Sequence, residues 1–281
     1  MLLFRTSKWW NSPSQSGETE SDLALFRPTK SPRDGNAVNK AGRLVLRGKL
    51  NGRAVKVYEA ANREHAHFIR SVSQHELLAD CFPTVRHIRS RFLVVDWAKN
   101  RGAATPPALE ELSRKLHETP LAGLPPSGFD YWHDLIRPRF VRAAELLEED
   151  GLACQVIERV NHVWDTAPKC LMHPDLTPRN VVSTAHNRYA VVDNELLGIG
   201  GLPLLDLCNT AYAIGAGACT DYGTTYLALR GTHVDEDLIR SLKDAWLARI
   251  VGSCFVAANL HAASKILKAY RQGENILPLS I

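Results

Sequence analysis

The sequence predicts an α+β fold in two lobes: a small lobe built on an antiparallel sheet, followed by a mostly helical lobe. A hairpin signal, Asn51-Gly52, lies between two segments of alternating apolar residues in the first hundred positions. From Ala108 onward, apolar residues recur mostly at helical spacing. Short apolar segments that suit strands return between residues 170 and 192. Strands before a helical region, with a small β insertion inside it, indicate this fold class.

In the first lobe, the return strand of the hairpin is expected at Ala54–Tyr58. A helix is expected to begin near Asn62, a residue type that caps helix N-termini well. Phe92–Trp97 is a short continuous apolar run, typical of a buried strand. A loop-like segment rich in Gly and Pro follows at Asn100–Pro107. We therefore place the lobes at residues 1–99 and 100–281.

The second lobe is expected to alternate helices with three short strands. The predicted helices are Ala108–His117, Phe129–Leu147 with an interruption at Pro138, Leu152–Trp164 and a long helix from Val234 to Tyr270. The predicted strands are Cys170–Met172, Asn180–Val182 and Tyr189–Val192.

Composition excludes several classes of protein. The chain has 281 residues, a net charge of +4 and 45% hydrophobic residues, which suits a globular protein with a sizeable core. It lacks the basic run with interleaved aromatic residues that nucleic-acid binders show, so no nucleic-acid partner is expected. The six cysteines are widely spaced, without a C-x-x-C pair, as in reduced cytosolic proteins. No segment suits a membrane span, and we expect a cytoplasmic protein.

Polar side chains stand at the ends of the three short strands. Asp175 follows the first strand, Asn180 precedes the second and Asp193 follows the third. Asn180 and Asp193 are thirteen positions apart, about one hairpin in length, so a hairpin would bring both to one edge beside Asp175. The sequence thus predicts that two acids and an amide converge.

These residue types suit the transfer of a phosphoryl group, which requires positioning and charge neutralisation. Mg²⁺ prefers hard oxygen ligands and takes one or two carboxylates together with phosphate oxygens. Asp193 would supply a carboxylate and Asn180 a neutral carbonyl oxygen. Asp175 would accept or orient the proton of an attacking hydroxyl.

The segments H-P-D-L-T-P-R-N at 173–180 and V-V-D-N-E at 191–195 resemble the aminoglycoside phosphotransferase and choline kinase family. This resemblance implies a protein-kinase-like two-lobed fold that uses ATP and Mg²⁺. It implies that Asp175 is the catalytic base and that Asp193 and Asn180 are metal ligands. His173 and Asp206 would be structural supports, and Glu195 would touch metal or substrate, or occupy a surface or capping position.

The resemblance extends less specifically into the first lobe. Lys56, in a V-K-V context, matches the strand lysine that holds the α- and β-phosphates of the nucleotide. Its helix partner would be Glu64, with Glu76 on the same predicted face as the alternative.

Two further parts of the first lobe would meet the nucleotide. Gly35 and Asn36 resemble a turn over the phosphates, although a full G-x-G-x-x-G is missing. Backbone groups from Val95 to Trp97 would meet the base.

The acceptor is expected to be small, or the exposed end of a glycan. Position 174 is proline, where regulated protein kinases carry an arginine, and only thirteen positions separate Asp193 from Asp206. We therefore predict phosphorylation of a hydroxyl on an aminoglycoside, amino-alcohol or sugar. The alternatives are a catalytically silent nucleotide-binding regulatory protein of the same fold and a protein Ser/Thr kinase. The choice of acceptor, ATP or GTP, and the oligomeric state all stay open.

Overall fold

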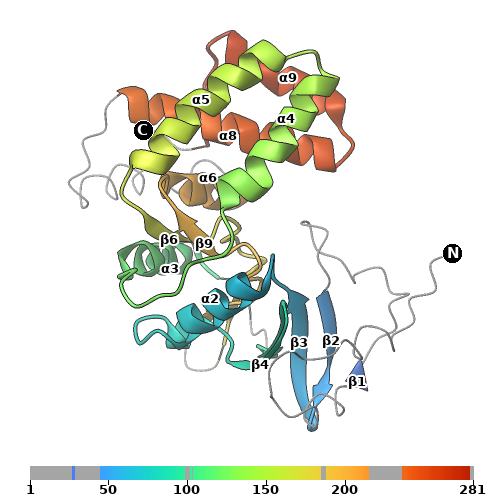
Figure 1. Ribbon diagram of the computed structural model, residues 1–281, viewed down its shortest axis with the longest axis vertical. Coiled ribbons are helices and arrows are strands. Elements are labelled where there is room, and N and C mark those ends of the chain that lie inside the picture. The colour runs from blue at the N-terminus through green and yellow to red at the C-terminus, as the bar shows by residue number, and fades with distance from the viewer. Residues whose placement is uncertain are drawn as a thin grey trace, which may run out of the picture.

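The structure, a computed structural model, describes residues 27–28, 45–98, 102, 104–184, 188–214 and 236–278. A five-stranded sheet with one helix beside it forms one end of the molecule, and a group of long helices forms the other (Figure 1). Short strands and two helices, α3 and α6, lie between these ends (Figure 1). This arrangement confirms the predicted α+β fold with a sheet-containing lobe and a helical lobe.

The sheet is antiparallel and has the strand order β1-β2-β3-β5-β4. Its strands are β1 (Arg27–Pro28), β2 (Val45–Leu50), β3 (Arg53–Glu59), β4 (Val85–Arg89) and β5 (Phe92–Asp96). The turn between β2 and β3 is the predicted Asn51-Gly52 pair, with φ values of 50° and 79°. Two left-handed residues in a two-residue loop give the twist that a hairpin needs, which explains the preference for Asn-Gly.

One helix packs near this sheet. Helix α2 (Arg63–Gln74) begins where the sequence predicted, because the side chain of Asn62 accepts a hydrogen bond from the backbone N–H of His65 at 2.8 Å. Its buried face carries His65, Ala66, Phe68, Ile69, Val72 and Ser73. A short 3-10 helix, η3 (Ala79–Cys81), follows and leads to β4.

The middle of the molecule contains two short strand pairs. Strand β7 (Val181–Ser183) pairs with β8 (Tyr189–Val191), which confirms the predicted hairpin. Strand β6 (Cys170–Met172) pairs with β9 (Gly198–Gly200), a strand that the sequence did not predict. Helices α3 (Pro106–Glu118) and α6 (Leu204–Ile214) flank these strands.

The helical lobe contains η4 (Tyr131–Ile136), α4 (Arg137–Leu146), α5 (Asp150–Thr166), α8 (Glu236–Val256) and α9 (Leu260–Arg271). The predicted interruption near Pro138 is a π-helical turn, η4, after which Pro138 occupies the first turn of α4.

The prediction of one long helix from Val234 to Tyr270 was wrong. The helical conformation is interrupted between α8 and α9, where Ala258 has a φ of 55°. Asn259 then caps α9 by accepting a hydrogen bond from the N–H of Ala262 at 3.1 Å. The side-chain cap offers the backbone an alternative to continuing the first helix.

A buried apolar cluster joins the sheet lobe to the middle of the chain. It includes Tyr58 of β3, Leu93 of β5, Leu109 of α3 and Val181 of β7. A second cluster fills the space among the helices, with Trp132, Phe140, Trp164 and Trp246 at its centre. Leu176, in the loop after β6, belongs to the first cluster, so this loop rests on a core that both parts of the chain build.

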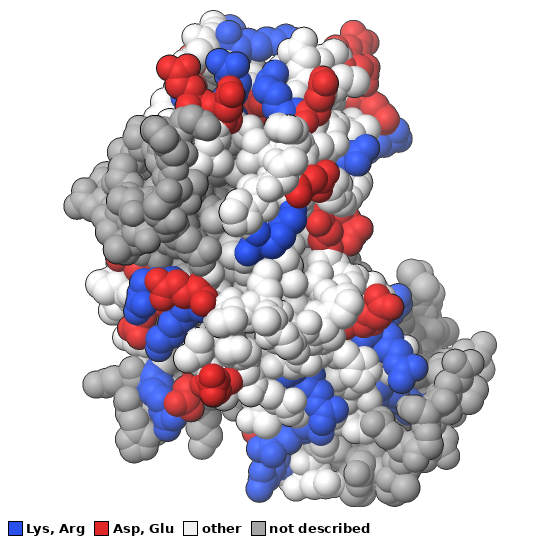
Figure 2. Space-filling view, turned by 60° about the vertical axis from the view of Figure 1, so that its left-hand side comes forward, with Lys and Arg blue, Asp and Glu red and all other residues white. Residues whose placement is uncertain are grey.

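In the described residues, no helix has the length and apolar character needed to cross a membrane. On the face shown in Figure 2, basic and acidic side chains are interspersed, and neither sign dominates.

Candidate active site

The loop that follows β6, residues 173–180, is fixed by one face of α6. The carboxylate of Asp206 accepts a hydrogen bond from the backbone N–H of His173 at 2.7 Å. One turn later, Asn209 donates to the carbonyl of Pro174, and Thr210 donates to the carbonyl of Leu176 at 2.8 Å. Residues three and four apart share a helix face, so this single face holds consecutive groups of the loop.

His173 ties the loop to the hairpin that follows it. Its side chain is fully buried, and Nε2 lies 2.8 Å from the carbonyl oxygen of Asp193. Asp206 is also buried, and its Oδ2 lies 3.5 Å from Nε2 of His117 on α3. These are bracing positions, of the kind that the resemblance implied for His173 and Asp206.

Asp175 and Asn180 are brought together at the end of the loop. The amide nitrogen of Asn180 donates to Oδ2 of Asp175 at 2.7 Å and to its backbone carbonyl at 2.8 Å. The carbonyl of Asn180 accepts from the N–H of Val192 at 2.8 Å, which sets Asn180 at the edge of the β7–β8 hairpin. The amide oxygen of Asn180 takes part in none of these bonds.

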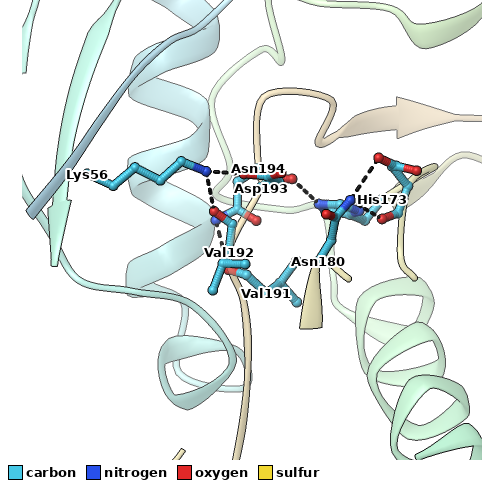
Figure 3. A network of polar contacts seen from close by, with 8 residues as sticks. Lys56, His173, Asn180, Val191, Val192, Asp193 and Asn194 are labelled. Carbon is cyan, nitrogen blue, oxygen red and sulfur yellow. Dashed lines mark hydrogen bonds and ion pairs between the residues drawn. The ribbon is translucent and has the colours of Figure 1, made fainter. Parts of the chain in front are cut away.

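Lys56 meets Asp193 on the other side of the site. The ammonium of Lys56, on β3, forms an ion pair with Oδ1 of Asp193 and donates to the carbonyl of Val192 at 2.7 Å. Figure 3 shows Lys56 reaching the Asp193 segment from the sheet lobe, with His173 and Asn180 on its opposite side. Asp193 is thus held from both lobes, through its carboxylate by Lys56 and through its backbone carbonyl by His173.

Glu195 lies buried beneath this ion pair. It is 6% exposed, and burial raises the pKa of its carboxyl, helped by the charge of Asp193 and opposed by that of Lys56. Its position is therefore interior, so a surface role is wrong.

Sequence reasoning missed two buried neighbours of the ion pair. The ring of Tyr58 lies 5.3 Å from the ammonium of Lys56, and the side-chain amide of Asn194 donates to the carbonyl of Val191 at 3.2 Å. Burial, followed by the charge of Glu195, raises the pKa of Tyr58. Tyr58 is two positions after Lys56, and this spacing on one strand was the available signal.

A family model described as the phosphotransferase enzyme family (APH) matches residues 40–242, which is most of the chain. The chain belongs to this family. A search of curated proteins found no match.

The solved structures that resemble this phosphotransferase share its fold at low sequence identity. LicA in complex with AMP has a TM-score of 0.55 at 13% identity and covers 84% of this chain and 91% of its own. An ethanolamine kinase from Plasmodium vivax has a TM-score of 0.53 at 12% identity, covering 90% and 83%. The aminoglycoside phosphotransferase APH(4)-Ia has a TM-score of 0.53 at 14% identity, covering 88% and 92%.

The structure does not pair Lys56 of this phosphotransferase with a helix glutamate. Glu64 and Glu76 are both exposed, and neither lies within ion-pair distance of Lys56 in the described chain. Helix α2 instead turns His65 inward, where Nε2 lies 2.7 Å from the carbonyl of Leu197. Glu76 lies beyond the end of α2 at Gln74. The predicted pairing is therefore corrected to Lys56 with Asp193.

Some of the backbone groups expected to meet the nucleotide base are already hydrogen-bonded within the sheet. Val95 lies in β5 between two neighbouring strands, and the N–H of Trp97 donates to the carbonyl of Ala54 at 3.0 Å. The N–H of Asp96 likewise donates to Thr84 at 3.0 Å. These two N–H groups serve the sheet, because β5 is an inner strand, and are not free for a base. Gly35 and Asn36 lie outside the described residues.

The described residues contain no group of three or more His, Cys, Asp or Glu side chains arranged as a metal site. A Mg²⁺ ion that shares its shell with phosphate oxygens and water requires only one or two protein ligands. The carboxylate of Asp193, 39% exposed as a side chain, and the amide oxygen of Asn180 are hard oxygen donors of that kind. The donor set therefore fits magnesium.

Proposed function

We propose that this chain transfers the γ-phosphoryl group of ATP to a hydroxyl of a small molecule or a glycan. The observation that carries the proposal is a pair of contacts, Asn180 with Asp175 and Lys56 with Asp193, on a loop and a hairpin that His173 joins. Membership of the phosphotransferase family supports the reaction type. Solved relatives in complex with AMP, or with ADP and hygromycin B, support a nucleotide as donor.

The proposed reaction assigns one task to each side chain. The acceptor oxygen bonds to the γ-phosphorus while the bond to the β–γ bridging oxygen breaks, and ADP leaves. The proton of the acceptor hydroxyl passes to the carboxylate of Asp175 and then to solvent. Lys56 holds the α- and β-phosphates, after exchanging its present contact with Asp193.

Asn180 and Asp193 would hold Mg²⁺, which neutralises charge on the phosphate oxygens when bound. Asn180 has a second task, because its amide nitrogen orients the carboxylate of Asp175. His173 and Asp206 keep the loop and the hairpin in register.

The experiment is an acceptor screen. Purified protein is incubated with MgATP, and in parallel with MgGTP, across aminoglycosides, amino-alcohols and sugars, and release of the nucleoside diphosphate is followed. We expect acceptor-dependent release that Asp175→Asn abolishes. Equal turnover in the wild type and this variant would contradict the proposal. Nucleotide binding with no turnover for any acceptor would favour the catalytically silent alternative.

A further inference from the structure

Two buried histidines hold the ends of the segment 193–197, which carries the aspartate assigned to the metal. Nε2 of His173 lies 2.8 Å from the carbonyl oxygen of Asp193, and Nε2 of His65 lies 2.7 Å from the carbonyl oxygen of Leu197. Both histidines are fully buried. The N–H of Leu197 also donates to a carbonyl inside the segment at 3.1 Å, which closes a turn. The backbone of the segment is therefore fixed at three points.

The partners of His65 determine which of its ring nitrogens carries the hydrogen. The backbone N–H of Ala61 donates to Nδ1 at 3.1 Å, so Nδ1 is an acceptor. A neutral imidazole has a single N–H, which must then be at Nε2. His65 therefore donates a buried hydrogen bond to the carbonyl of Leu197.

The loop before η4 keeps His65 in this orientation. The ring of Phe129 stacks on the imidazole with 4.9 Å between the ring centroids, and the side-chain amide of Asn62 donates to the carbonyl of Gly128. Gly128 has a φ of 60°, and a Cβ placed there would lie 2.7 Å from the backbone nitrogen of His65. The imidazole is thus held on a ring face as well as at both nitrogens. A side chain locked by packing and hydrogen bonds is suited to positioning another group.

Helix α2 is thereby connected to Asp193 through the backbone. The carboxylate of Asp193 is 39% exposed as a side chain, so packing around the carboxylate does not fully fix its place. Its position depends on the segment 193–197 that carries it. Hydrogen bonds that orient a metal ligand from outside the coordination shell typically change metal affinity by about 10- to 100-fold.

We infer that His65 is a positioning residue for the carboxylate of Asp193, acting through the hydrogen bond from its Nε2–H to the carbonyl of Leu197. This bond holds the segment 193–197 so that the carboxylate meets the metal that accompanies the nucleotide. The inference rests on the proposed assignment of Asp193 as a metal ligand. It gives α2 a task in the site other than the pairing that the sequence predicted between Glu64 and Lys56.

Two substitutions separate the hydrogen-bond donor of His65 from its ring. His65→Gln keeps an N–H donor near the place of Nε2 and loses the stacked ring, whereas His65→Phe keeps the ring and loses the donor. Titration of a fluorescent ATP analogue in Mg²⁺ and in EDTA gives the gain in nucleotide affinity that the metal provides. We expect His65→Phe to lower this gain by about tenfold and His65→Gln to retain most of it.

Val72→Ala is the control for a general loss of packing in α2. Val72 is fully buried and follows His65 by seven positions, so it lies on the same helix face about 10 Å further along. We expect this variant to melt at a lower temperature than the wild type and to keep the full Mg²⁺-dependent gain. Thermal melting of every variant shows whether the gain merely follows stability.

Asp193→Asn tests the coupling between the two residues. On this background His65→Phe should leave the residual Mg²⁺ dependence unchanged, because the carboxylate that it positions is gone. The inference is overturned if His65→Phe does not reduce the gain in the otherwise wild-type chain, or if it reduces it equally on the Asp193→Asn background. It is also overturned if His65→Gln or Val72→Ala reduces the gain as much as His65→Phe does.

These measurements need no acceptor, which separates the inference from the proposed transfer. If the expected binding pattern holds and no acceptor is phosphorylated, the inference stands and the phosphotransfer proposal fails. If acceptors are phosphorylated and the Mg²⁺-dependent gain is the same in the wild type and His65→Phe, the proposed function stands and the inference is overturned.

Discussion

Single side chains hold the main chain of the catalytic region in place. Asp206 and Thr210 bind backbone groups of the loop, and Lys56 and His173 bind backbone carbonyls of the hairpin. Most of these bonds are buried, where an unpaired polar group costs about 1–3 kcal/mol. The positions of Asp175 and Asp193 therefore depend on few residues, which makes substitutions here informative.

Asp175→Asn is expected to remove transfer and to preserve nucleotide binding. The change keeps the shape of the side chain but removes the carboxylate that accepts the proton, which is worth about 10²- to 10⁴-fold in kcat. Steady-state kinetics and nucleotide titration measure the two effects. A matched loss of nucleotide affinity would contradict the assignment of Asp175 as base.

Asp193→Asn is expected to have the opposite profile, because it removes the only charged oxygen ligand assigned to the metal. Nucleotide affinity should fall strongly in the presence of Mg²⁺ and change little in EDTA. Titration of a fluorescent ATP analogue with and without Mg²⁺ measures this difference. An unchanged Mg²⁺ dependence would remove Asp193 from the metal site.

The sequence predicted that Asp175, Asn180 and Asp193 converge, because the hairpin between them is short and local. It did not predict the partner of Lys56. That partner depends on the rotation of α2, which Asn62 and the contact of His65 with Leu197 set. Leu197 lies 132 positions after His65, and no local pattern reveals such a contact.

At the level of elements, the β6–β9 pair packs closely against α5. A Cβ on Gly200 would lie 2.5 Å from Sδ of Met172 and 2.6 Å from the ring of Trp164. Gly200→Ala is therefore expected to lower the free energy of unfolding by about 1–3 kcal/mol. Gly151→Ala, in the first turn of α5 with no atom within 4 Å of a built Cβ, should stabilise by about 0.5–1 kcal/mol. Urea unfolding of both variants measures these changes in the free energy of unfolding. An equal change for the two substitutions would contradict this packing.

Three helices meet at a polar junction that should respond to alkaline pH. Asp244 of α8 accepts from Arg159 of α5 at 2.5 Å and from the hydroxyl of Tyr270 of α9. Burial, followed by the hydrogen bond to Asp244, raises the pKa of Tyr270 from 10 to about 12.

A raised tyrosine pKa means that the stabilisation is complete below pH 10 and is lost as pH rises through 12. The free energy of unfolding of the wild type should therefore fall more steeply between pH 10 and 12 than that of Tyr270→Phe. Tyr212→Phe, at an exposed tyrosine, is the control and should follow the wild type. Parallel curves for wild type and Tyr270→Phe would show that this junction does not titrate as described.

Elements with strong local signals were predicted well, and those defined by distant pairing were not. The β2–β3 hairpin follows from Asn51-Gly52, and α2 follows from its cap at Asn62. Strand β9 was missed because it is only three residues long, Gly198–Gly200, and exists through its pairing with β6. The break before Asn259 was missed because the apolar periodicity continues across it.

At the level of the whole molecule, the buried cluster that contains Tyr58 and Leu93 also contains Leu109 and Val181 from beyond the proposed lobe boundary. The division of the chain into two lobes between residues 99 and 100 stays a prediction. The apolar core, in contrast, contains residues from both sides of this boundary. A shared core couples the unfolding of the two parts. The sequence could not show this, because periodicity identifies a buried face but not the face that covers it.

Leu109→Ala is expected to destabilise both lobes together. Leu109 is fully buried, so its truncation should cost about 2–5 kcal/mol. Calorimetry should show one transition in the wild type and one, shifted to lower temperature, in the variant. Leu146→Ala, at a half-exposed leucine, is the control and should shift the transition much less. Two separate transitions would indicate that each lobe has an independent core.

The strand that carries Lys56 is the third of five, with β2 on one edge and β5 on the other. Its peptide groups are therefore hydrogen-bonded to a neighbouring strand on each side. This pairing keeps the backbone at that position from shifting when a nucleotide binds. Whatever rearrangement the ammonium makes to release Asp193 must come from rotation about its own four methylene groups. In the proposed reaction, binding of the phosphate donor therefore requires one flexible side chain to change conformation, and the sheet around it can stay rigid.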